Sequence, residues 1–271
     1  MTDRYCVIGN PIAHSKSPQI HAAFAAETGQ DIHYERCLAP LDGFADVLRT
    51  LVQQGYKGAN VTVPFKLEAA TLATRLTERA RAAGAVNTLS FKDGEIVGDN
   101  TDGPGLVADI VRNAGFALAN KRILLLGAGG AARGIMLPFI DEHPQSILVA
   151  NRTRATADSL VAGFAGNGVQ LAACGFDEIE GPFDIVVNAT SASLADTMPP
   201  VPASAFAKGT LALDIMYGSA PSAFMNFAAG QGADTRDGLG MLVEQAAEAF
   251  TLWRGVRPGT DELLSNLRKQ K

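Results

Sequence analysis

Hydrophobic and polar positions in this chain follow two periods, which replace one another along the sequence. Short runs that are apolar throughout, or apolar at every second residue, give way to longer stretches in which apolar residues recur every three or four positions. The first pattern is typical of β-strands and the second of amphipathic helices. Because strands and helices alternate almost throughout, the sequence predicts an α/β fold.

The predicted elements form two series, which meet near residues 102–105. The first series has predicted strands at residues 5–8, 32–38, 59–63, 86–91 and 95–97 and predicted helices at 18–28, 44–54, 77–83 and 105–114. The second has predicted strands at residues 122–126, 146–150, 169–172, 184–188 and 211–215 and predicted helices at 131–140 and 155–164. An Asp93-Gly94 pair between the last two strands of the first series predicts a hairpin turn.

Continuous apolar runs at residues 123–126 and 185–187 are typical of strands that a parallel sheet buries on both faces. We therefore expect two domains. Residues 1–102, joined by C-terminal helices at 241–271, form the expected substrate-binding and catalytic domain, with a mixed or mostly parallel sheet. Residues 103–240 form the expected Rossmann-type dinucleotide-binding domain.

Composition and charge argue against several classes of function. Hydrophobic residues make up 47% of the 271 residues and charged residues 19%, which is a globular balance. The net charge of −5 argues against nucleic-acid and membrane partners, because both favour basic patches. Cys6, Cys37 and Cys174 are widely spaced, as suits a reducing compartment. We see no signal peptide and no apolar run of membrane-spanning length, so a cytoplasmic location is expected.

The sequence at residues 60–66 alternates between polar and apolar positions. Asn60, Thr62, Pro64 and Lys66 have one parity, whereas Val61, Val63 and Phe65 have the other. Alternate residues of a strand point to opposite faces, so the segment predicts a strand that buries its apolar side and directs polar groups into a cleft. The alternative is an ordinary edge strand with a surface lysine.

A glycine-rich run at residues 127–132 predicts a dinucleotide site. It follows an apolar strand, opens a helix and matches the pattern G-x-G-x-x-A. Glycines there let the backbone approach a pyrophosphate at the helix N-terminus. The alternative is a glycine turn that serves packing alone. The candidate residues are Gly127, Ala128, Gly129, Gly130 and Ala131.

The end of the next predicted strand indicates which cofactor is bound. An NAD site usually has Asp or Glu there, but this chain has Asn151, Arg152, Thr153 and Arg154. Guanidinium groups match a 2′-phosphate, so NADP(H) is favoured, with Arg152 as the main candidate. The alternative is a pair of solvated arginines at the start of a helix.

Small polar residues at two other strand ends each have two interpretations. Thr190 and Ser191 follow the predicted strand at 184–188, where they either face the cofactor or cap the next turn. Ser15 and Ser17 follow the first strand and could hold a small carboxylate. Ser17 stands before a proline, so it could equally be a helix N-cap.

Asp102 also has two interpretations. It could cap the helix that follows, or its carboxylate could hold the Lys66 ammonium in a catalytic pair. The four histidines show no metal-ligand spacing, so no metal site is expected.

These motifs, in this order, resemble the shikimate dehydrogenase family over nearly the full length of the chain. The matching segments are residues 9–17, 58–66, 84–88, 98–103, 127–131, 151–153, 188–191 and 237–242. The resemblance implies reversible, NADPH-dependent reduction of 3-dehydroshikimate to shikimate, in aromatic amino acid biosynthesis. The small-molecule partners are then shikimate and 3-dehydroshikimate, and the sequence leaves a monomer and a homodimer equally open.

The resemblance also implies roles for individual residues. Lys66 and Asp102 form the catalytic pair, in which Lys66 donates the proton or stabilises the oxyanion. The residues implied to bind or border the substrate are Ser15, Ser17, Asn60, Thr62, Asn87, Tyr217 and Gln245. Gly238 and Met241 join the residues already named as the implied cofactor site.

Three departures from the family pattern concern the loops around the site. Residues 192–193 are Ala-Ser, where a glycine often follows Asn-Ala-Thr-Ser. Thr156 stands where many members have an arginine, so Arg154 is the candidate substitute. Ser222 follows a proline where a threonine is frequent.

Two other functions compete with this interpretation. A quinate/shikimate dehydrogenase would need more room beside the substrate carboxylate, and relatives that favour quinate tend to lose one serine of the Ser15/Ser17 pair. A non-catalytic NADP-sensing relative would be expected to lose a catalytic polar residue, whereas Lys66 and Asp102 are both present.

Overall fold

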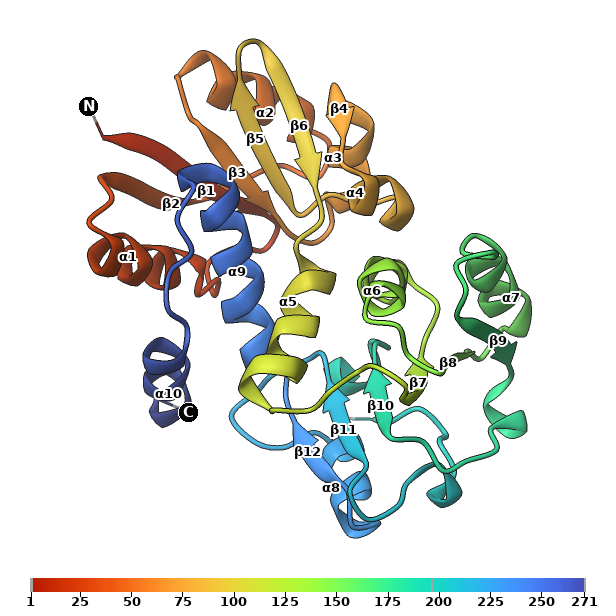
Figure 1. Ribbon diagram of the computed structural model, residues 1–271. Coiled ribbons are helices and arrows are strands. Elements are labelled where there is room, and N and C mark those ends of the chain that lie inside the picture. The colour runs from red at the N-terminus through yellow and green to blue at the C-terminus, as the bar shows by residue number, and fades with distance from the viewer. Residues whose placement is uncertain (1, 196, 271) are drawn as a thin grey trace. The chain divides into compact units, whose positions relative to one another are not determined.

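The structure, a computed structural model, describes residues 2–195 and 197–270. The chain folds into two compact units. The first comprises Met1–Gly105 and Val243–Asn266, and the second comprises Leu106–Leu242 and Leu267–Lys271. Each unit is built around one six-stranded sheet, as Figure 1 shows. The predicted α/β fold is therefore confirmed.

The first unit has a mixed sheet with strand order β2-β1-β3-β5-β6-β4. Strands β2, β1 and β3 are parallel, β5 is antiparallel to β3 and β6, and β4 is parallel to β6. Its strands are β1 (Asp3–Gly9), β2 (Ile32–Leu38), β3 (Gly58–Val61), β4 (Arg75–Leu76), β5 (Thr88–Lys92) and β6 (Glu95–Asp99). Its helices are α1 (Ser17–Thr28), α2 (Phe44–Gln53), α3 (Lys66–Leu72) and α4 (Glu78–Ala83).

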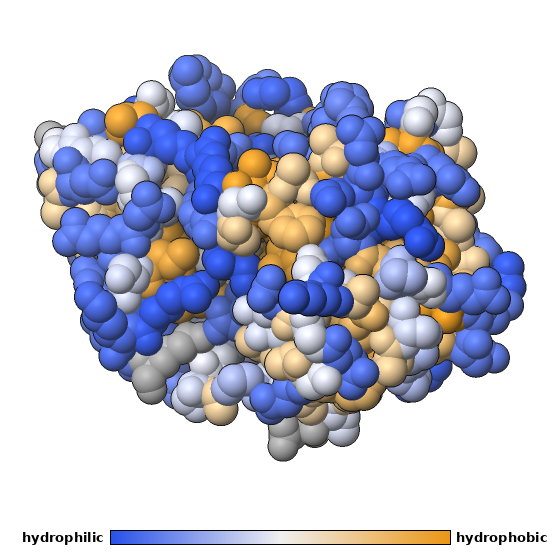
Figure 2. Space-filling model, turned by 60° about the horizontal axis from the view of Figure 1, so that its bottom comes forward, coloured by the Kyte–Doolittle hydropathy of each residue, from blue (hydrophilic) through white to orange (hydrophobic). Residues whose placement is uncertain are grey.

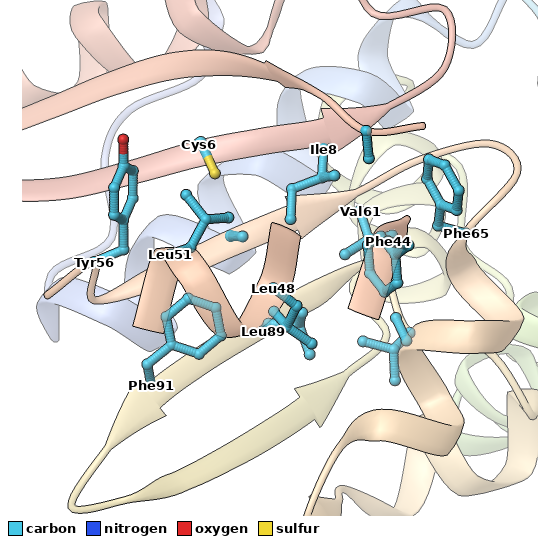
Figure 3. Packing of buried hydrophobic residues seen from close by; sticks show 14 of the residues in the cluster. Cys6, Ile8, Phe44, Leu48, Leu51, Tyr56, Val61, Phe65, Leu89 and Phe91 are labelled. Carbon is cyan, nitrogen blue, oxygen red and sulfur yellow. The ribbon is translucent and has the colours of Figure 1, made fainter. Parts of the chain in front are cut away.

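Helix α2 covers the core of this unit. Its buried residues Phe44, Leu48 and Leu51 are spaced so that they share one face, and Figure 3 shows them in the same apolar cluster as Ile8 of β1. Phe44 stacks on Phe65, with ring centroids 4.8 Å apart. Burial of each such side chain stabilises the fold by roughly 1.5–3 kcal/mol. The Phe44–Phe65 contact thereby anchors the turn that leads into α3.

The strand predicted at residues 59–63 is present but ends earlier than expected, and the polar and apolar alternation through residue 66 does not belong to a strand. Strand β3 ends at Val61, and Val63, which was expected to be buried, is 67% exposed. The backbone turns here because the Phe65 N–H donates to the Thr62 carbonyl at 3.0 Å. Lys66 is consequently the first residue of α3 and not a member of the strand.

The predicted hairpin between β5 and β6 is confirmed. Lys92 pairs with Glu95, and the two residues between them, Asp93 and Gly94, have φ values of 52° and 81°. Positive φ at both central positions is the conformation that an Asp-Gly pair favours.

The second unit has an all-parallel sheet with strand order β12-β11-β10-β7-β8-β9. Its strands are β7 (Arg122–Leu126), β8 (Ser146–Ala150), β9 (Gln170–Cys174), β10 (Ile185–Asn188), β11 (Leu211–Asp214) and β12 (Asp234–Arg236). Helices α6 (Gly130–Asp141), α7 (Arg154–Ala162) and α8 (Ala223–Gly230) connect them. Residues 123–126 have no exposed surface, so the predicted two-sided burial of β7 is confirmed. This is the Rossmann-type arrangement expected from the sequence.

Two helices have residues in both units. Helix α5 (Asp102–Ala108) continues into a π-helical turn at Asp109–Asn113, and α9 (Leu239–Arg254) precedes α10 (Asp261–Lys269). The segment at 243–266 belongs to the first unit. There the indole N–H of Trp253 donates to the Leu89 carbonyl at 3.1 Å.

Hydrophilic side chains cover much of the face shown in Figure 2, with apolar patches between them. None of the described helices is long and apolar enough to cross a membrane.

Candidate active site and cofactor loop

The strand directions of the first unit bring three polar segments to one edge of its sheet. Strand β3 ends near Asn60, and the antiparallel strand β5 begins at Thr88, which pairs with Asn60. Strand β6 ends at Asp99, which also pairs with Thr88. The polar loop at residues 100–102 therefore continues from the same edge.

Lys66 and Asp102 meet at this edge. The Lys66 Nζ donates to the Asp102 Oδ2 at 2.5 Å. The Lys66 side chain is 31% exposed and the Asp102 side chain 18% exposed. The Asp102 Oδ1 accepts from the Asn87 Nδ2 at 2.9 Å. Both carboxylate oxygens are thus engaged by side chains, which favours the ion-pair interpretation of Asp102 over simple helix capping. An ammonium has three donors, so Lys66 keeps others for an acceptor in the site.

Asn87 is buried and fixes the position of this pair. Its Oδ1 accepts from the Thr101 N–H at 2.8 Å, and its Nδ2 also donates to the Gln245 Oε1 at 3.4 Å. Because the two ends of the amide have different partners, its orientation is set. The structure therefore brings four predicted residues together: Lys66, Asn87, Asp102 and Gln245.

The two serines form a separate pair. The Ser15 hydroxyl donates to the Ser17 Oγ at 3.2 Å, and the Ser17 N–H donates to the Ser15 Oγ at 3.3 Å. The alternative prediction that Ser17 is an N-cap is wrong. Helix α1 begins at Ser17 itself, Lys16 occupies the N-cap position, and no side chain makes a capping hydrogen bond.

Asn60 and Thr62 lie at the end of β3 and just beyond it. Asn60 is buried, and its Nδ2 donates to the Thr88 Oγ1 at 3.1 Å. Thr88 in turn hydrogen-bonds to the Asn87 Oδ1 at 3.0 Å, so Asn60 joins the network around the Lys66–Asp102 pair. The Thr62 N–H donates to the Ile8 carbonyl at 2.9 Å, which ties the turn to β1.

The glycine loop of the second unit has room for a ligand. Gly127 has a φ of 101°, and its N–H donates to the Ala150 carbonyl at 2.8 Å. A Cβ at Gly129 or Gly130 would meet no heavy atom within 4 Å, so the backbone is open at both positions. Helix α6, 12 residues long, starts at Gly130 with no side-chain cap. Its first N–H groups therefore suit a bound phosphate. Ala128 is buried and Ala131 is half-buried in the same loop.

The two candidate arginines differ in their surroundings. The Arg154 Nη1 donates to the Glu178 Oε1 at 2.7 Å, and its Nε lies 3.7 Å from the Asp158 Oδ2. Arg152 is exposed and has no ion-pair partner among the described residues. Asn151 donates from Nδ2 to the Thr153 carbonyl at 2.9 Å, which shapes the loop between them. Arg152 is therefore the arginine that is free for a phosphate.

The hydroxyl of Thr190 serves the local turn. It donates to the Asn188 Oδ1 at 2.7 Å and accepts from the Ala192 N–H at 3.3 Å, which is the capping alternative for this residue. Ser191 is exposed beside it. Residues 192–193 are Ala-Ser where family members often have a glycine. The Ser193 hydroxyl donates to the Asp214 Oδ2 at 2.6 Å, and this hydrogen bond fixes the loop.

The remaining predicted residues also lie in the second unit. Tyr217 is 38% exposed, and burial raises the pKa of its phenol. Met241 is buried. A Cβ at Gly238 would lie 2.0 Å from the Ile215 carbonyl oxygen, so only glycine fits where the chain passes the end of β11.

Sequence reasoning missed three residues that support the site. Thr88 and Thr101 have no exposed surface and link Asn60 with Asn87, and Tyr34 donates to the Asn60 Oδ1 at 2.7 Å. Both threonines stand within the family motifs next to predicted residues, which is a signal that could have found them. Tyr34 has no such signal, because its proximity to Asn60 depends on the sheet order.

Three family models match the chain. The model of the shikimate dehydrogenase substrate binding domain matches residues 7–89. The model of shikimate / quinate 5-dehydrogenase matches residues 109–198, and that of the shikimate 5'-dehydrogenase C-terminal domain matches residues 238–264.

Individual proteins are similar over the whole chain. A shikimate dehydrogenase (NADP(+)) of Herminiimonas arsenicoxydans is 61% identical over 270 residues, which cover 100% of this chain and 98% of that protein. The shikimate 5-dehydrogenase of Thermus thermophilus, solved in complex with NADP(H) and shikimate, has a TM-score of 0.87 at 30% identity and 100% coverage of both chains. A ligand-free 5-ketofructose reductase of Gluconobacter sp. strain CHM43 has a TM-score of 0.90 at 28% identity, covering 100% of this chain and 99% of that one. On this evidence the chain belongs to the shikimate dehydrogenase family.

Proposed function

We infer that the protein is a shikimate dehydrogenase, which reduces 3-dehydroshikimate to shikimate reversibly with NADPH. The observation that carries this function is the Lys66–Asp102 pair, held by Asn87 and Gln245 in a chain that is 61% identical to a shikimate dehydrogenase (NADP(+)). A non-catalytic relative would have no use for so specific an arrangement of an ammonium and a carboxylate.

The chemistry requires a proton or a positive charge at the substrate carbonyl. The nicotinamide supplies the hydride when the cofactor is bound. Negative charge then develops on the carbonyl oxygen, and the Lys66 ammonium stabilises it or donates a proton to it. Asp102 orients Lys66, and Asn87 holds Asp102. In the reverse direction the substrate hydroxyl loses its proton as the hydride leaves; with Lys66 as the proton donor of the forward reaction, its uncharged amine is the acceptor.

The residues proposed to contact the substrate form two groups, one for its carboxylate and one for its ring hydroxyls. The Ser15 and Ser17 hydroxyls suit a carboxylate, since both can donate and are already placed side by side. Asn60, Thr62, Asn87 and Gln245 suit the ring hydroxyls, because amide and hydroxyl groups both donate and accept. Tyr217 is proposed as a further substrate contact.

The proposed cofactor site fits the residues present. The open backbone at Gly129 and Gly130 and the uncapped start of α6 suit the pyrophosphate. Arg152 is assigned to the 2′-phosphate, with Asn151 and Thr153 shaping its loop. Arg154 is proposed to contribute less to binding of the 2′-phosphate, because it already forms ion pairs with Glu178 and Asp158. Thr190, Ser191, Gly238 and Met241 are proposed to border the nicotinamide end.

We also propose a cytoplasmic location. Its support is that Cys6, Cys37 and Cys174 are all free thiols, which a reducing compartment maintains.

The function is tested by following the absorbance of reduced nicotinamide with shikimate and with quinate, each with NADP and with NAD. Rapid reduction with shikimate and NADP alone is the expected result. Comparable rates with quinate or NAD would move the protein to the broader quinate/shikimate class. A folded sample that binds NADPH but turns over none of the four pairs would contradict the proposal.

A further inference from the structure

The hydroxyl of Tyr34 is buried next to the proposed substrate site. Tyr34 lies on β2, a strand that contributes no predicted site residue, and is 9% exposed. Its hydroxyl donates to the Asn60 Oδ1 at 2.7 Å. Asn60, in turn, is only 6% exposed, so water cannot readily replace this hydrogen bond.

The other end of the Asn60 amide shows which way it faces. Its Nδ2 donates to the Asn87 carbonyl at 3.2 Å and to the Thr88 Oγ1 at 3.1 Å. A carbonyl oxygen can only accept, so the NH₂ group must face Asn87 and the Oδ1 must face Tyr34. Tyr34 is therefore the donor, and its hydroxyl opposes any rotation of the Asn60 amide.

Aromatic packing in turn fixes the ring of Tyr34. The His21 ring stacks on it with centroids 4.1 Å apart and an interplanar angle of 6°, and Trp253 lies 6.3 Å away. His21 is fully buried, which lowers the pKa of its imidazole to about 3. Neither ring nitrogen has a hydrogen-bond partner among the described residues. A neutral imidazole can stack at this distance without placing a charge beside the phenol.

Burial keeps the Tyr34 hydroxyl protonated. It raises the pKa of the phenol well above the ordinary value. The phenol consequently stays neutral and keeps its proton for the hydrogen bond to the Asn60 Oδ1.

We propose that Tyr34 is a positioning residue for substrate binding, which acts by holding the Asn60 amide in a single orientation. The inference rests on the proposed function, because it takes Asn60 as a substrate contact. An amide that is already fixed loses no orientational freedom when the substrate binds, so affinity is gained without a contact between Tyr34 and substrate.

The test is Tyr34→Phe, which keeps the ring stacked on His21 and removes only the hydroxyl. We expect the KM for shikimate to rise about tenfold, while the KM for NADP is unchanged and kcat stays within about twofold, as for the loss of a uniform binding interaction. The matched control is Tyr56→Phe. Tyr56 is also buried, but its hydroxyl contacts Glu35 and Arg4, away from Asn60, so the KM for shikimate should not change.

A double-mutant cycle separates positioning from general loosening of the core. In an Asn60→Ala background, Tyr34→Phe should add almost nothing to the KM for shikimate, because the amide on which Tyr34 acts is gone. Additive effects would overturn the proposal, as would equal KM increases in the Tyr34→Phe and Tyr56→Phe variants or an unchanged KM in Tyr34→Phe.

Thr88 provides a second route if Tyr34→Phe folds poorly. Thr88→Val removes the acceptor at the other end of the amide and should also raise the KM for shikimate, whereas Thr88→Ser should stay close to the wild type. Equal KM values for both Thr88 variants would contradict the role of amide orientation. If the wild type fails to oxidise shikimate, the proposed function itself fails, and calorimetric binding of shikimate to the same variants still decides whether Tyr34 positions Asn60.

Discussion

The proposed reaction depends on one ammonium group, that of Lys66. Replacement of Lys66 by alanine removes the ammonium that stabilises the developing oxyanion or donates a proton to it, so kcat should fall by about 10²- to 10⁴-fold. The affinity for NADPH, measured by fluorescence titration, should change little. Lys57→Ala is the matched control, because Lys57 is exposed and precedes β3 at the opposite edge of the sheet. Turnover that survives in Lys66→Ala at the wild-type rate would remove Lys66 from the mechanism.

The proposed preference for NADP over NAD depends mainly on Arg152. Arg152→Ala should raise the KM for NADP by about 10- to 100-fold, because a charged hydrogen bond to the 2′-phosphate is lost, and should leave the KM for NAD unchanged. Arg154→Ala should have a smaller effect, since Glu178 and Asp158 already pair with Arg154. Steady-state kinetics with both cofactors checks this, and equal effects of Arg152→Ala on both cofactors would exclude the 2′-phosphate role.

Sequence patterns found the groups at the Lys66–Asp102 site but not how they are held. The ordered motifs of the sequence indicate Lys66, Asn87 and Asp102. The orientation of Asn87 could not be inferred, because its partners Thr101 and Gln245 are respectively 14 and 158 positions away along the chain. Only the folded sheet and the return of α9 place these groups within hydrogen-bonding distance.

At the scale of elements, the approach of α5 to α9 depends on the absence of a side chain. A Cβ at Gly105 would lie 2.6 Å from the Gln245 backbone nitrogen and 2.7 Å from its Cβ. Gly105→Ala should therefore push the two helices apart, with a loss of about 1–3 kcal/mol in stability. Because Gln245 contacts Asn87, the KM for shikimate should rise as well.

Gly230→Ala is the control for that prediction. Gly230 ends α8, and a Cβ there would meet no heavy atom within 4 Å. Alanine should thus be neutral or slightly stabilising at this position. Chemical denaturation and shikimate kinetics on both variants make the comparison. Equal stabilities and equal KM values for the two variants would show that the helices do not need the close approach.

Elements with strong apolar patterns were predictable, and those without them were not. β7 and β8 match the predicted bounds because each contains a continuous run of apolar residues. β2 also matches its predicted bounds, although its apolar and polar residues are interspersed. β4 and β12 were missed, since they are only two and three residues long and are largely polar. Their pairing comes from neighbouring strands, which no local pattern reveals.

At the scale of the whole molecule, the C-terminal segment completes the first unit through buried charges. Glu244 of α9 has no exposed surface, and its carboxylate accepts from Arg257 and Thr260, each at 2.6 Å. Arg257 also pairs with Glu248, which pairs with Arg79. A carboxylate buried so fully depends on these donors, so the segment has one defined way to fold back. It brings Trp253 and Phe250 against His21.

This aromatic cluster makes the stability of the first unit depend on pH. Burial lowers the pKa of His21 to about 3, whereas an unfolded histidine has a pKa of about 6.5. Below pH 6.5 the unfolded chain therefore binds a proton that the folded chain does not. Stability is complete above that pH and falls as the pH is lowered, with a slope that approaches about 1.4 kcal/mol per pH unit. Of the rings around His21, namely Phe24, Tyr34, Phe250 and Trp253, only Tyr34 titrates, and burial keeps it neutral.

The measurement is urea unfolding between pH 5 and 8, followed by fluorescence of Trp253, the single tryptophan in the chain, which lies in this unit. His21→Phe keeps an aromatic ring against Tyr34 but cannot bind a proton, so its stability should fall less steeply than that of the wild type between pH 6.5 and 5. His33→Gln should retain the wild-type slope, because the His33 side chain is 60% exposed. If His21→Phe and the wild type lose stability in parallel over this range, the buried imidazole is not the group that couples folding to pH.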